Sequence, residues 1–133
     1  MLNDSYRLSM EAKYFFETGD YKKAEKLAKK AYILDPYNRM AFTVYTQSKI
    51  AKQWQNYIND SIKYFKEIEQ IANKNKITKK DKQKVKIMLE IIMEEYKTLP
   101  PSHLLPENLK IKAKEMYEKG KKLYVEVFGK RSG

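Results

Sequence analysis

The sequence has 133 residues, which is the length of one domain that can bury its own hydrophobic core. It contains no cysteine and a single histidine, His103, so disulfides, thiolate metal sites and multi-histidine metal sites are excluded. Its formal net charge is +11, from 28 lysine and arginine residues against 17 aspartate and glutamate residues. We therefore expect one basic domain, residues 1–133, that needs no metal or other cofactor.

The positive charge is concentrated towards the C-terminal half. Residues 1–40 hold eight basic and six acidic side chains, residues 41–70 hold four and three, and residues 71–133 hold sixteen and eight. Such an excess can serve an acidic partner, nucleic acid or an anionic membrane surface. The alternative is a lysine-rich chain with ordinary solvated faces, and we favour that interpretation.

The sequence has no pattern of a targeting or membrane-spanning segment. Residues 1–20 include Asp4, Glu11 and Glu17 and lack the unbroken apolar core of a signal peptide. Apolar runs are two or three residues long, far shorter than a membrane span. Together with the absence of cysteine, these features predict a cytoplasmic protein without a membrane partner.

Apolar periodicity and breaking residues predict six helices and no strand. The first helix is expected over residues 3–18 and ends before Gly19. Asp20 is expected to cap the second helix, residues 20–34, which stops before Pro36 because proline disfavours helix in the residue that precedes it. Each helix has an apolar stripe, formed by Leu8, Ala12, Phe15 and Phe16 in the first and by Ala24, Leu27, Ala28, Ala31 and Leu34 in the second.

The third and fourth helices are expected over residues 38–52 and 57–72. The polar stretch 53–56 is taken as the turn between them. Their inward positions are Ala41, Val44, Tyr45, Ser48 and Ala51 in the third helix and Ile58, Ser61, Ile62, Phe65 and Ile68 in the fourth.

Two further helices are expected near the C-terminus. Thr78 begins the fifth, and Asp81 three residues later completes a pair typical of a capping box. The sixth spans residues 106–128 and starts with a proline in its first turn. Gly120 lies on its apolar face, where it permits close packing, and residues 129–133 are expected to form a mobile tail.

Residues 5–38 carry a spaced pattern of small and large side chains. Ala12 and Ala24 would let two helices approach closely, and Phe15 would fill the space beside them. The pattern is completed by Leu8, the turn Gly19-Asp20-Tyr21, Ala31 and Pro36. It resembles the tetratricopeptide repeat, a 34-residue pair of antiparallel helices. Glu11 and Ala28 depart from it, since the family usually has a leucine and an aromatic residue there.

A second, degenerate repeat is expected over residues 39–73, carried by Phe42, Tyr45, Ser61 and Phe65. Residues 78–128 form a third hairpin by pattern, without a repeat signature, and would cap the stack unless a second copy of the chain does so in a homo-oligomer. The resemblance implies an all-α fold of antiparallel helical hairpins, a tetratricopeptide-like right-handed stack of about six helices.

The resemblance also implies a concave groove that holds a peptide or protein segment, lined by the first helix of each repeat. The corresponding places are Tyr6, Ser9, Lys13 and Phe16 in the first repeat and Met40, Thr43, Gln47 and Ile50 in the second. The alternative is that Phe16 and Ile50 are core residues covered by the third hairpin. Some family members hold acidic C-terminal tails through a lysine–asparagine clamp, but here Ser9 and Val44 stand at two of the clamp positions.

Lysines surround the expected start of the fifth helix, and Lys79, Lys80 and Lys82 are candidates for phosphate contacts. Against this role, arginine is scarce, although its guanidinium is the better bidentate phosphate ligand. The alternative is that these lysines only keep the connector before the fifth helix solvated and make no phosphate contact.

The sequence carries no recognisable catalytic constellation. It lacks a phosphate loop, a nucleophile elbow and metal-ligand spacing, and Glu94 and Glu95 have no histidine partner in the sequence pattern. We therefore expect a noncatalytic interaction module, a tetratricopeptide-like adaptor for a protein or peptide. The alternative function is a basic accessory protein that binds nucleic acid.

Overall fold

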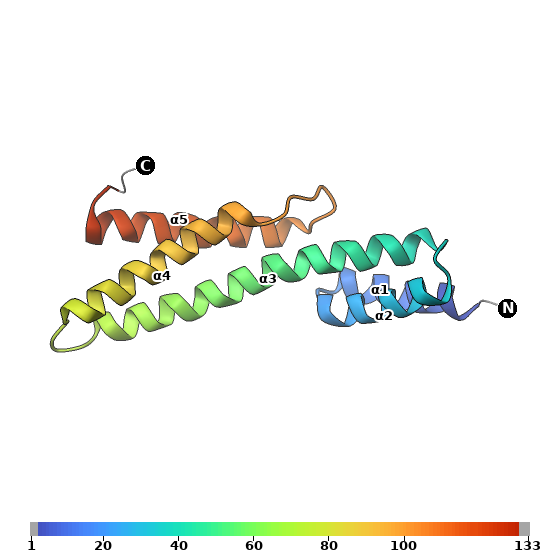
Figure 1. Ribbon diagram of the computed structural model, residues 1–133, viewed down its shortest axis with the longest axis horizontal. Helices are drawn as coiled ribbons and strands as arrows, with labels where there is room; N and C mark the ends of the chain where they lie inside the picture. The colour runs from blue at the N-terminus through green and yellow to red at the C-terminus, as the bar shows by residue number, and fades with distance from the viewer. Residues whose placement is uncertain (1–2, 131–133) are drawn as a thin grey trace. The chain divides into compact units, whose positions relative to one another are not determined.

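A computed structural model describes residues 3–130, and over these residues the fold is all-α, as predicted. The described chain forms five helices and no strand (Figure 1). They are α1 (Asp4–Glu17), α2 (Tyr21–Leu34), α3 (Arg39–Ala72), α4 (Lys79–Thr98) and α5 (Glu107–Phe128). The expected mobile tail lies partly outside the described residues, which end at residue 130.

The described chain is organised as two compact units. The first unit consists of residues 3–53 and 100–106, and the second of residues 54–99 and 107–130. The expectation of a single domain stays a prediction, because two units that share α3 can still fold as one.

One prediction about the helices is wrong: residues 53–56 do not form a turn. They lie inside α3, which is continuous over 34 residues, so the number of helices is five and not about six. The four residues are Gln, Trp, Gln and Asn, and none is a helix breaker such as glycine or proline. The segment expected to form a second hairpin, residues 39–73, is therefore one helix up to Ala72.

The first two helices begin at polar caps, of which Asp20 was predicted from the sequence. Asn3 accepts a hydrogen bond from the backbone N–H of Tyr6 at 2.7 Å, and Asp20 accepts one from Lys23 at 3.1 Å. Gly19 has φ +92°, a left-handed conformation that glycine adopts without strain. Side-chain oxygens at these positions satisfy N–H groups that have no partner within the helix.

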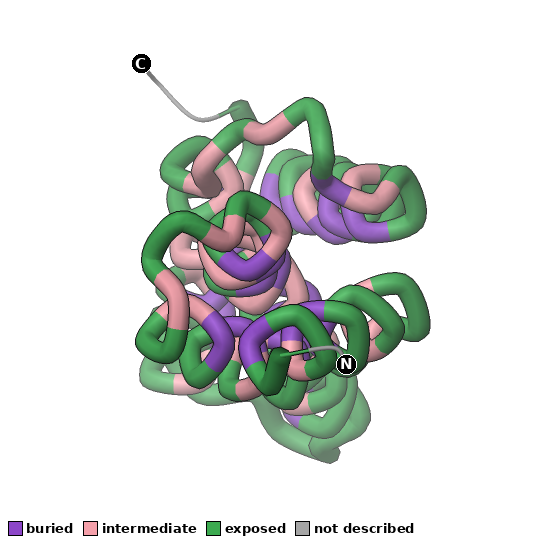
Figure 2. Tube along the Cα trace, turned by 90° about the vertical axis from the view of Figure 1, so that its right-hand side faces the viewer, coloured by how far each residue is buried: buried purple, intermediate pink, exposed green. Residues whose placement is uncertain are grey.

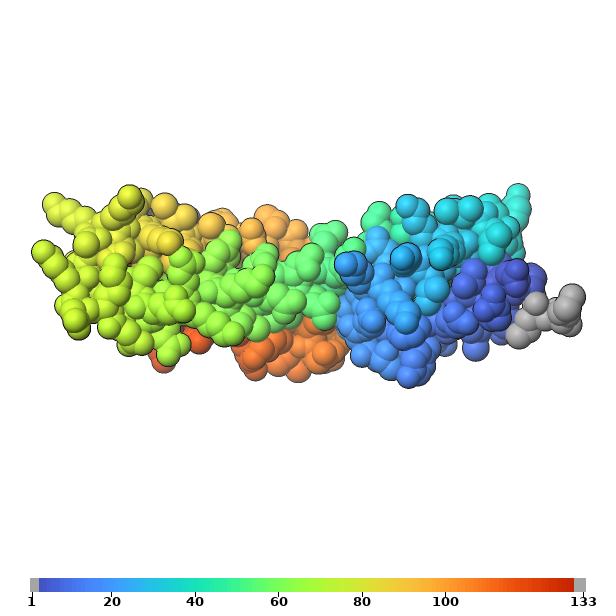
Figure 3. All heavy atoms as spheres, turned by 90° about the horizontal axis from the view of Figure 1, so that it is seen from below, coloured from blue at the N-terminus to red at the C-terminus, as the bar shows by residue number. Residues whose placement is uncertain are grey.

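Small side chains form the core of the first unit. Ala12, Ala24 and Ala28 are completely buried and meet the side chain of Val44, so α1, α2 and the first part of α3 approach closely. In the space-filling view, the atoms of α1 and α2 (dark to light blue) abut along their lengths (Figure 3). Buried and exposed residues alternate around each helix, so buried segments recur along one side (Figure 2).

A hydrogen-bond network at Asn38 joins α1 to the C-terminal part of α2 and to the start of α3. The Asn38 amide nitrogen donates to Ser5 Oγ at 3.0 Å and to Ser9 Oγ at 3.3 Å. Ser5 Oγ in turn donates to the carbonyl of Ala31 in α2 at 2.8 Å. The Asn38 carbonyl oxygen accepts from the N–H of Ala41 at 3.1 Å, so the same side chain caps α3.

The second unit combines the C-terminal part of α3 with α4 and α5. Thr78 and Asp81 form the predicted capping box at the start of α4. Leu89 and Ile92 of α4 are almost completely buried. Gly120 of α5 lies against Ile92, and a Cβ atom at Gly120 would be 3.0 Å from Ile92 Cγ2, so the predicted close packing is present.

We predict that Asn38→Asp destabilises the protein by about 1–3 kcal/mol. Aspartate can still cap α3, but it cannot donate to Ser5 and Ser9, whose buried hydroxyls then lose a partner. Chemical denaturation measures the change. Asn38→Ala is the matched comparison and should lose about 1 kcal/mol more, since it removes the cap as well. Equal stability of the Asp variant and the wild type would contradict the network's importance.

A second prediction concerns the contact between α4 and α5. Gly120→Val should destabilise the protein by about 1–3 kcal/mol, because its side chain would overlap Ile92 in a packed interior. Thermal and urea unfolding provide the measurement. Glu118→Val, at an exposed position of the same helix, is the control and should have a much smaller effect.

Candidate functional site

The first unit contains an open cavity of about 370 Å³ between α1, α3 and the loop before α5. This volume lies within the range of about 300–1,000 Å³ that is usual for ligand sites. The residues that line this cavity, here called the α1–α3 groove, are Lys13, Phe16, Glu17, Arg39, Met40, Thr43, Val44, Gln47 and Leu104.

Helical spacing brings the lining side chains to one face of each helix. On α1, Lys13 is followed by Phe16 and Glu17 three and four residues later. The Phe16 ring is held edge-on against the ring of Tyr21, with ring centres 5.4 Å apart. On α3, Met40 and Val44 are also four residues apart, and Val44 belongs to the alanine-rich core. The apolar floor of the groove is therefore continuous with the core of the unit.

The loop of residues 100–106 supplies one wall of the groove. Ser102 donates a hydrogen bond from its hydroxyl to Gln47 Oε1 at 2.5 Å, and its oxygen accepts from the N–H of Leu104 at 3.1 Å. Leu105 is buried and anchors the loop, whereas Leu104 is 47% exposed at the groove. The loop thus holds an apolar side chain beside the floor formed by the helices.

Charged side chains lie around this apolar floor. Lys13 and Arg39 carry positive charge, and Glu17 carries negative charge. Because the lining has two cations and one anion around an apolar floor, it favours a ligand that carries an acidic group next to an apolar group.

The structure brings together five of the eight residues predicted to bind a partner. Lys13, Phe16, Met40, Thr43 and Gln47 line the α1–α3 groove, and their role in binding stays a prediction. The remaining three are Tyr6, Ser9 and Ile50, which are not among the lining residues. Ser9 is completely buried and donates to the carbonyl of Tyr6 at 2.8 Å, so it is an internal structural residue. Tyr6 is exposed and Ile50 is half-buried.

Four lining residues were not predicted. Glu17 and Arg39 are one helical turn from Lys13 and Thr43, so extending each stripe by four residues could have found them. Val44 was predicted to face inward on the third helix and stands at one of the family's clamp positions, but it was not predicted to line a groove. Leu104 had no signal in the sequence, because a loop far along the chain brings it to the groove.

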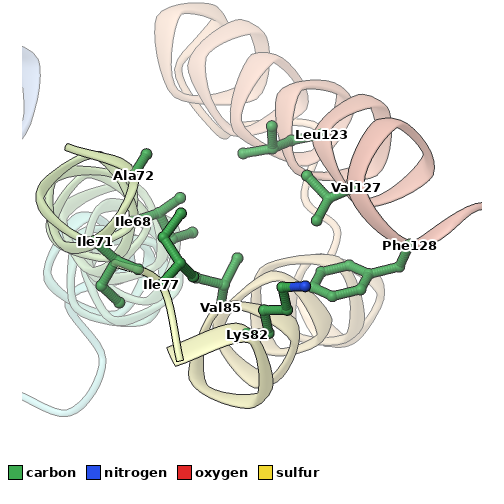
Figure 4. A pocket seen from close by; sticks show the side chains of 9 residues that line it. All are labelled: Ile68, Ile71, Ala72, Ile77, Lys82, Val85, Leu123, Val127 and Phe128. Atoms are coloured by element: carbon green, nitrogen blue, oxygen red, sulfur yellow. The ribbon is translucent and has the colours of Figure 1, made fainter. Parts of the chain in front are cut away.

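The lysines proposed for phosphate contact lie in the first turn of α4, in the second unit. Lys79, Lys80 and Lys82 are all exposed. Lys82 lines a cavity of about 190 Å³ whose other eight lining residues are apolar (Figure 4). This volume is near that of a cavity of about 150 Å³ that holds one benzene molecule. The cavity therefore has room for a single apolar group and is smaller than most ligand sites.

Two neighbouring lysines are engaged in ion pairs within the second unit. Lys74 Nζ lies 2.8 Å from Asp81, and Lys84 Nζ lies 2.6 Å from Glu67. Hydrogen bonds from Lys74 and from the backbone of Thr78 lower the pKa of Asp81 to about 2. The hydrogen bond and the charge of Glu67 raise the pKa of Lys84. Asp81 thus already supplies a negative charge at the N-terminus of α4, which reduces the attraction of this helix end for a phosphate.

Comparison with protein-family models, with curated proteins and with solved structures gave no match for this chain. The tetratricopeptide resemblance therefore depends on residues 5–38 and stays a prediction. Over residues 3–130, no helix combines the length and the apolar character that crossing a membrane requires. In the same range, no three acidic, histidine or cysteine side chains are grouped as metal ligands would be.

We predict a pH-dependent contribution of Asp81 to stability. Its pKa in the folded protein, about 2, is below the ordinary value of 3.8, so its stabilising effect is complete above pH 3.8 and is lost as the pH falls through 2. Asp81→Asn should therefore be less stable than wild type at neutral pH, and the difference should shrink between pH 4 and pH 2. Urea denaturation at several pH values measures it. In Lys74→Gln, the Asp81 pKa measured by NMR should rise towards 3.8; an unchanged pKa would contradict the assigned cause.

Proposed function

We propose that the protein is a noncatalytic interaction module and that its α1–α3 groove binds a peptide segment of another protein. The observation that carries this proposal is the groove itself: an apolar floor of Phe16, Met40 and Val44, open to solvent and bordered by charged side chains. An open groove of this composition suits the insertion of one or two apolar side chains, whereas the polar groups fix the orientation of the peptide.

The electrostatics favour a peptide with acidic residues beside its apolar anchor. Lys13 and Arg39 would face these acidic groups, and Glu17 would repel an acidic residue at its own end of the groove. The formal net charge of +11 acts in the same direction, because it attracts an acidic partner over a longer range.

The tetratricopeptide resemblance supports the same function. In that family the groove is formed by the first helix of each repeat, and here α1 and the first part of α3 line the groove, although α3 continues without the turn of a second repeat. The small residues Ala12 and Ala24, both completely buried, support the close approach of α1 and α2 that the repeat requires. A stack of several repeats is not needed for the proposed groove, since all its lining residues belong to the first unit.

We predict that filling the groove weakens peptide binding. Peptides selected from a random displayed library against the whole protein should share a large apolar residue next to aspartate or glutamate. Thr43→Trp places a bulky ring in the groove at an exposed position and should lower the affinity of a selected peptide by about tenfold or more, the equivalent of ~1.4 kcal/mol. Fluorescence anisotropy of the labelled synthetic peptide measures the affinity.

The matched control is Lys49→Trp, which adds the same ring at an exposed position of α3 that does not line the groove. It should bind as the wild type does. Lys13→Glu should weaken binding of acidic peptides and spare peptides without acidic residues. Equal loss in Thr43→Trp and Lys49→Trp, or selected peptides with no shared apolar and acidic residues, would refute the proposed site.

A further inference from the structure

The second unit contains a groove that combines aromatic rings with positive charge. Its volume is about 420 Å³, and it lies along the pair α4 and α5. Met93 and Lys97 line it from α4, Tyr117, Lys121 and Tyr124 line it from α5, and Lys130 lines it from just beyond α5. We call it the α4–α5 groove. It shares no residue with the α1–α3 groove.

The aromatic side of this groove is held by other rings of the same unit. Tyr117 stacks on Tyr96 with ring centres 4.6 Å apart and an angle of 20° between the planes. Tyr96 is in turn bordered by Trp54 and by Tyr57. Tyr57 donates a hydrogen bond to the carbonyl of Ile92 at 2.8 Å, which ties the cluster to α4. A ring supported in this way loses little conformational entropy when a flat ligand packs beside it.

The charged side chains that line the α4–α5 groove are all positive. Its lining includes three lysines and no acidic residue. Glu94 approaches Lys97 only at 4.0 Å, and both side chains are more than half exposed, so solvent screens this pair. The groove also lies in the part of the chain, residues 71–133, in which basic side chains outnumber acidic ones by sixteen to eight. Its ligand is therefore expected to be an anion.

We propose that the α4–α5 groove binds single-stranded nucleic acid, with an unpaired base against the aromatic side at Tyr117 and backbone phosphates at Lys97, Lys121 and Lys130. Grooves that hold single strands combine aromatic stacking surfaces with cations that follow the backbone. A duplex cannot use Tyr117 in this way, because its bases are already stacked on one another. An acidic peptide without apolar or aromatic side chains, such as polyglutamate, would use the lysines but would gain little from the ring surface.

This site differs from the lysines at the start of α4. Lys82 is the one lysine of a cavity in which Phe128 is the one aromatic residue, whereas three lysines and two tyrosines line the α4–α5 groove. The proposal is also independent of peptide binding in the first unit, so failure of one leaves the other unaffected.

The test is a fluorescence-anisotropy titration of the whole protein with a labelled short oligothymidylate at several salt concentrations. The slope of log affinity against log salt should be about −0.7 per neutralised phosphate on a single strand. Lys97→Gln combined with Lys121→Gln should therefore flatten the slope by about 1.4. The charge-matched control is Lys79→Gln combined with Lys80→Gln, in which the slope should change much less. Equal flattening in both double variants would overturn the assignment of the site.

Stacking is tested separately from charge. Tyr117→Leu should lower affinity by about 5- to 150-fold, the equivalent of 1–3 kcal/mol for one stacked base, and Tyr117→Phe should retain most of the affinity. The wild type should also bind the oligothymidylate more tightly than an abasic strand of equal length or polyglutamate. Equal binding of these three probes would overturn the proposal, and this comparison decides it even if Tyr117→Leu does not fold. Absence of binding at low salt would overturn it as well.

Discussion

The side chain of Asn38 links the three helices of the first unit. It stands between α2 and α3 and makes two kinds of hydrogen bond at once: its carbonyl oxygen caps α3, and its amide nitrogen donates to Ser5 and Ser9 of α1. Ser5 in turn donates a hydrogen bond to the carbonyl of Ala31, in the C-terminal part of α2. Because α3 begins directly after Asn38, this network sets the position from which Arg39 and Met40 reach the groove opposite Lys13 and Phe16.

Helix ends were predictable where their signals are local. Asp20 and Thr78 directly precede the first residues of α2 and α4, and Asp81 lies in the first turn of α4. Their side chains accept the hydrogen bonds expected of them. Polarity alone was misleading at residues 53–56. Gln, Trp and Asn are all compatible with a helix, and the buried residues Ala51 and Ile58 on either side are seven residues apart, so the buried stripe continues through the segment. A turn there would have required a stronger breaker.

The candidate groove was predictable only in part, for a similar reason. Periodicity on a helix places Lys13 with Phe16 and Met40 with Thr43, so a pattern of spacing is enough to group them. Spacing does not distinguish a groove residue from one that turns inward, and Ser9 is buried because its hydroxyl has partners in Tyr6 and Asn38. Leu104 could not be predicted, because its place depends on the tertiary contact between Ser102 and Gln47, whose positions are 55 residues apart.

The same contact has a consequence for the order in which the protein is made. Ribosomal synthesis is vectorial, and residues 100–106 of the first unit leave the ribosome only after α4 has been translated. Until then the nascent chain has α1, α2 and α3 but lacks both Ser102, the partner of Gln47, and Leu104, the loop's side of the groove. The groove therefore becomes complete late, after a large part of the second unit already exists. For the same reason no single cleavage of the chain can release the first unit whole, since its two segments are separated by residues 54–99.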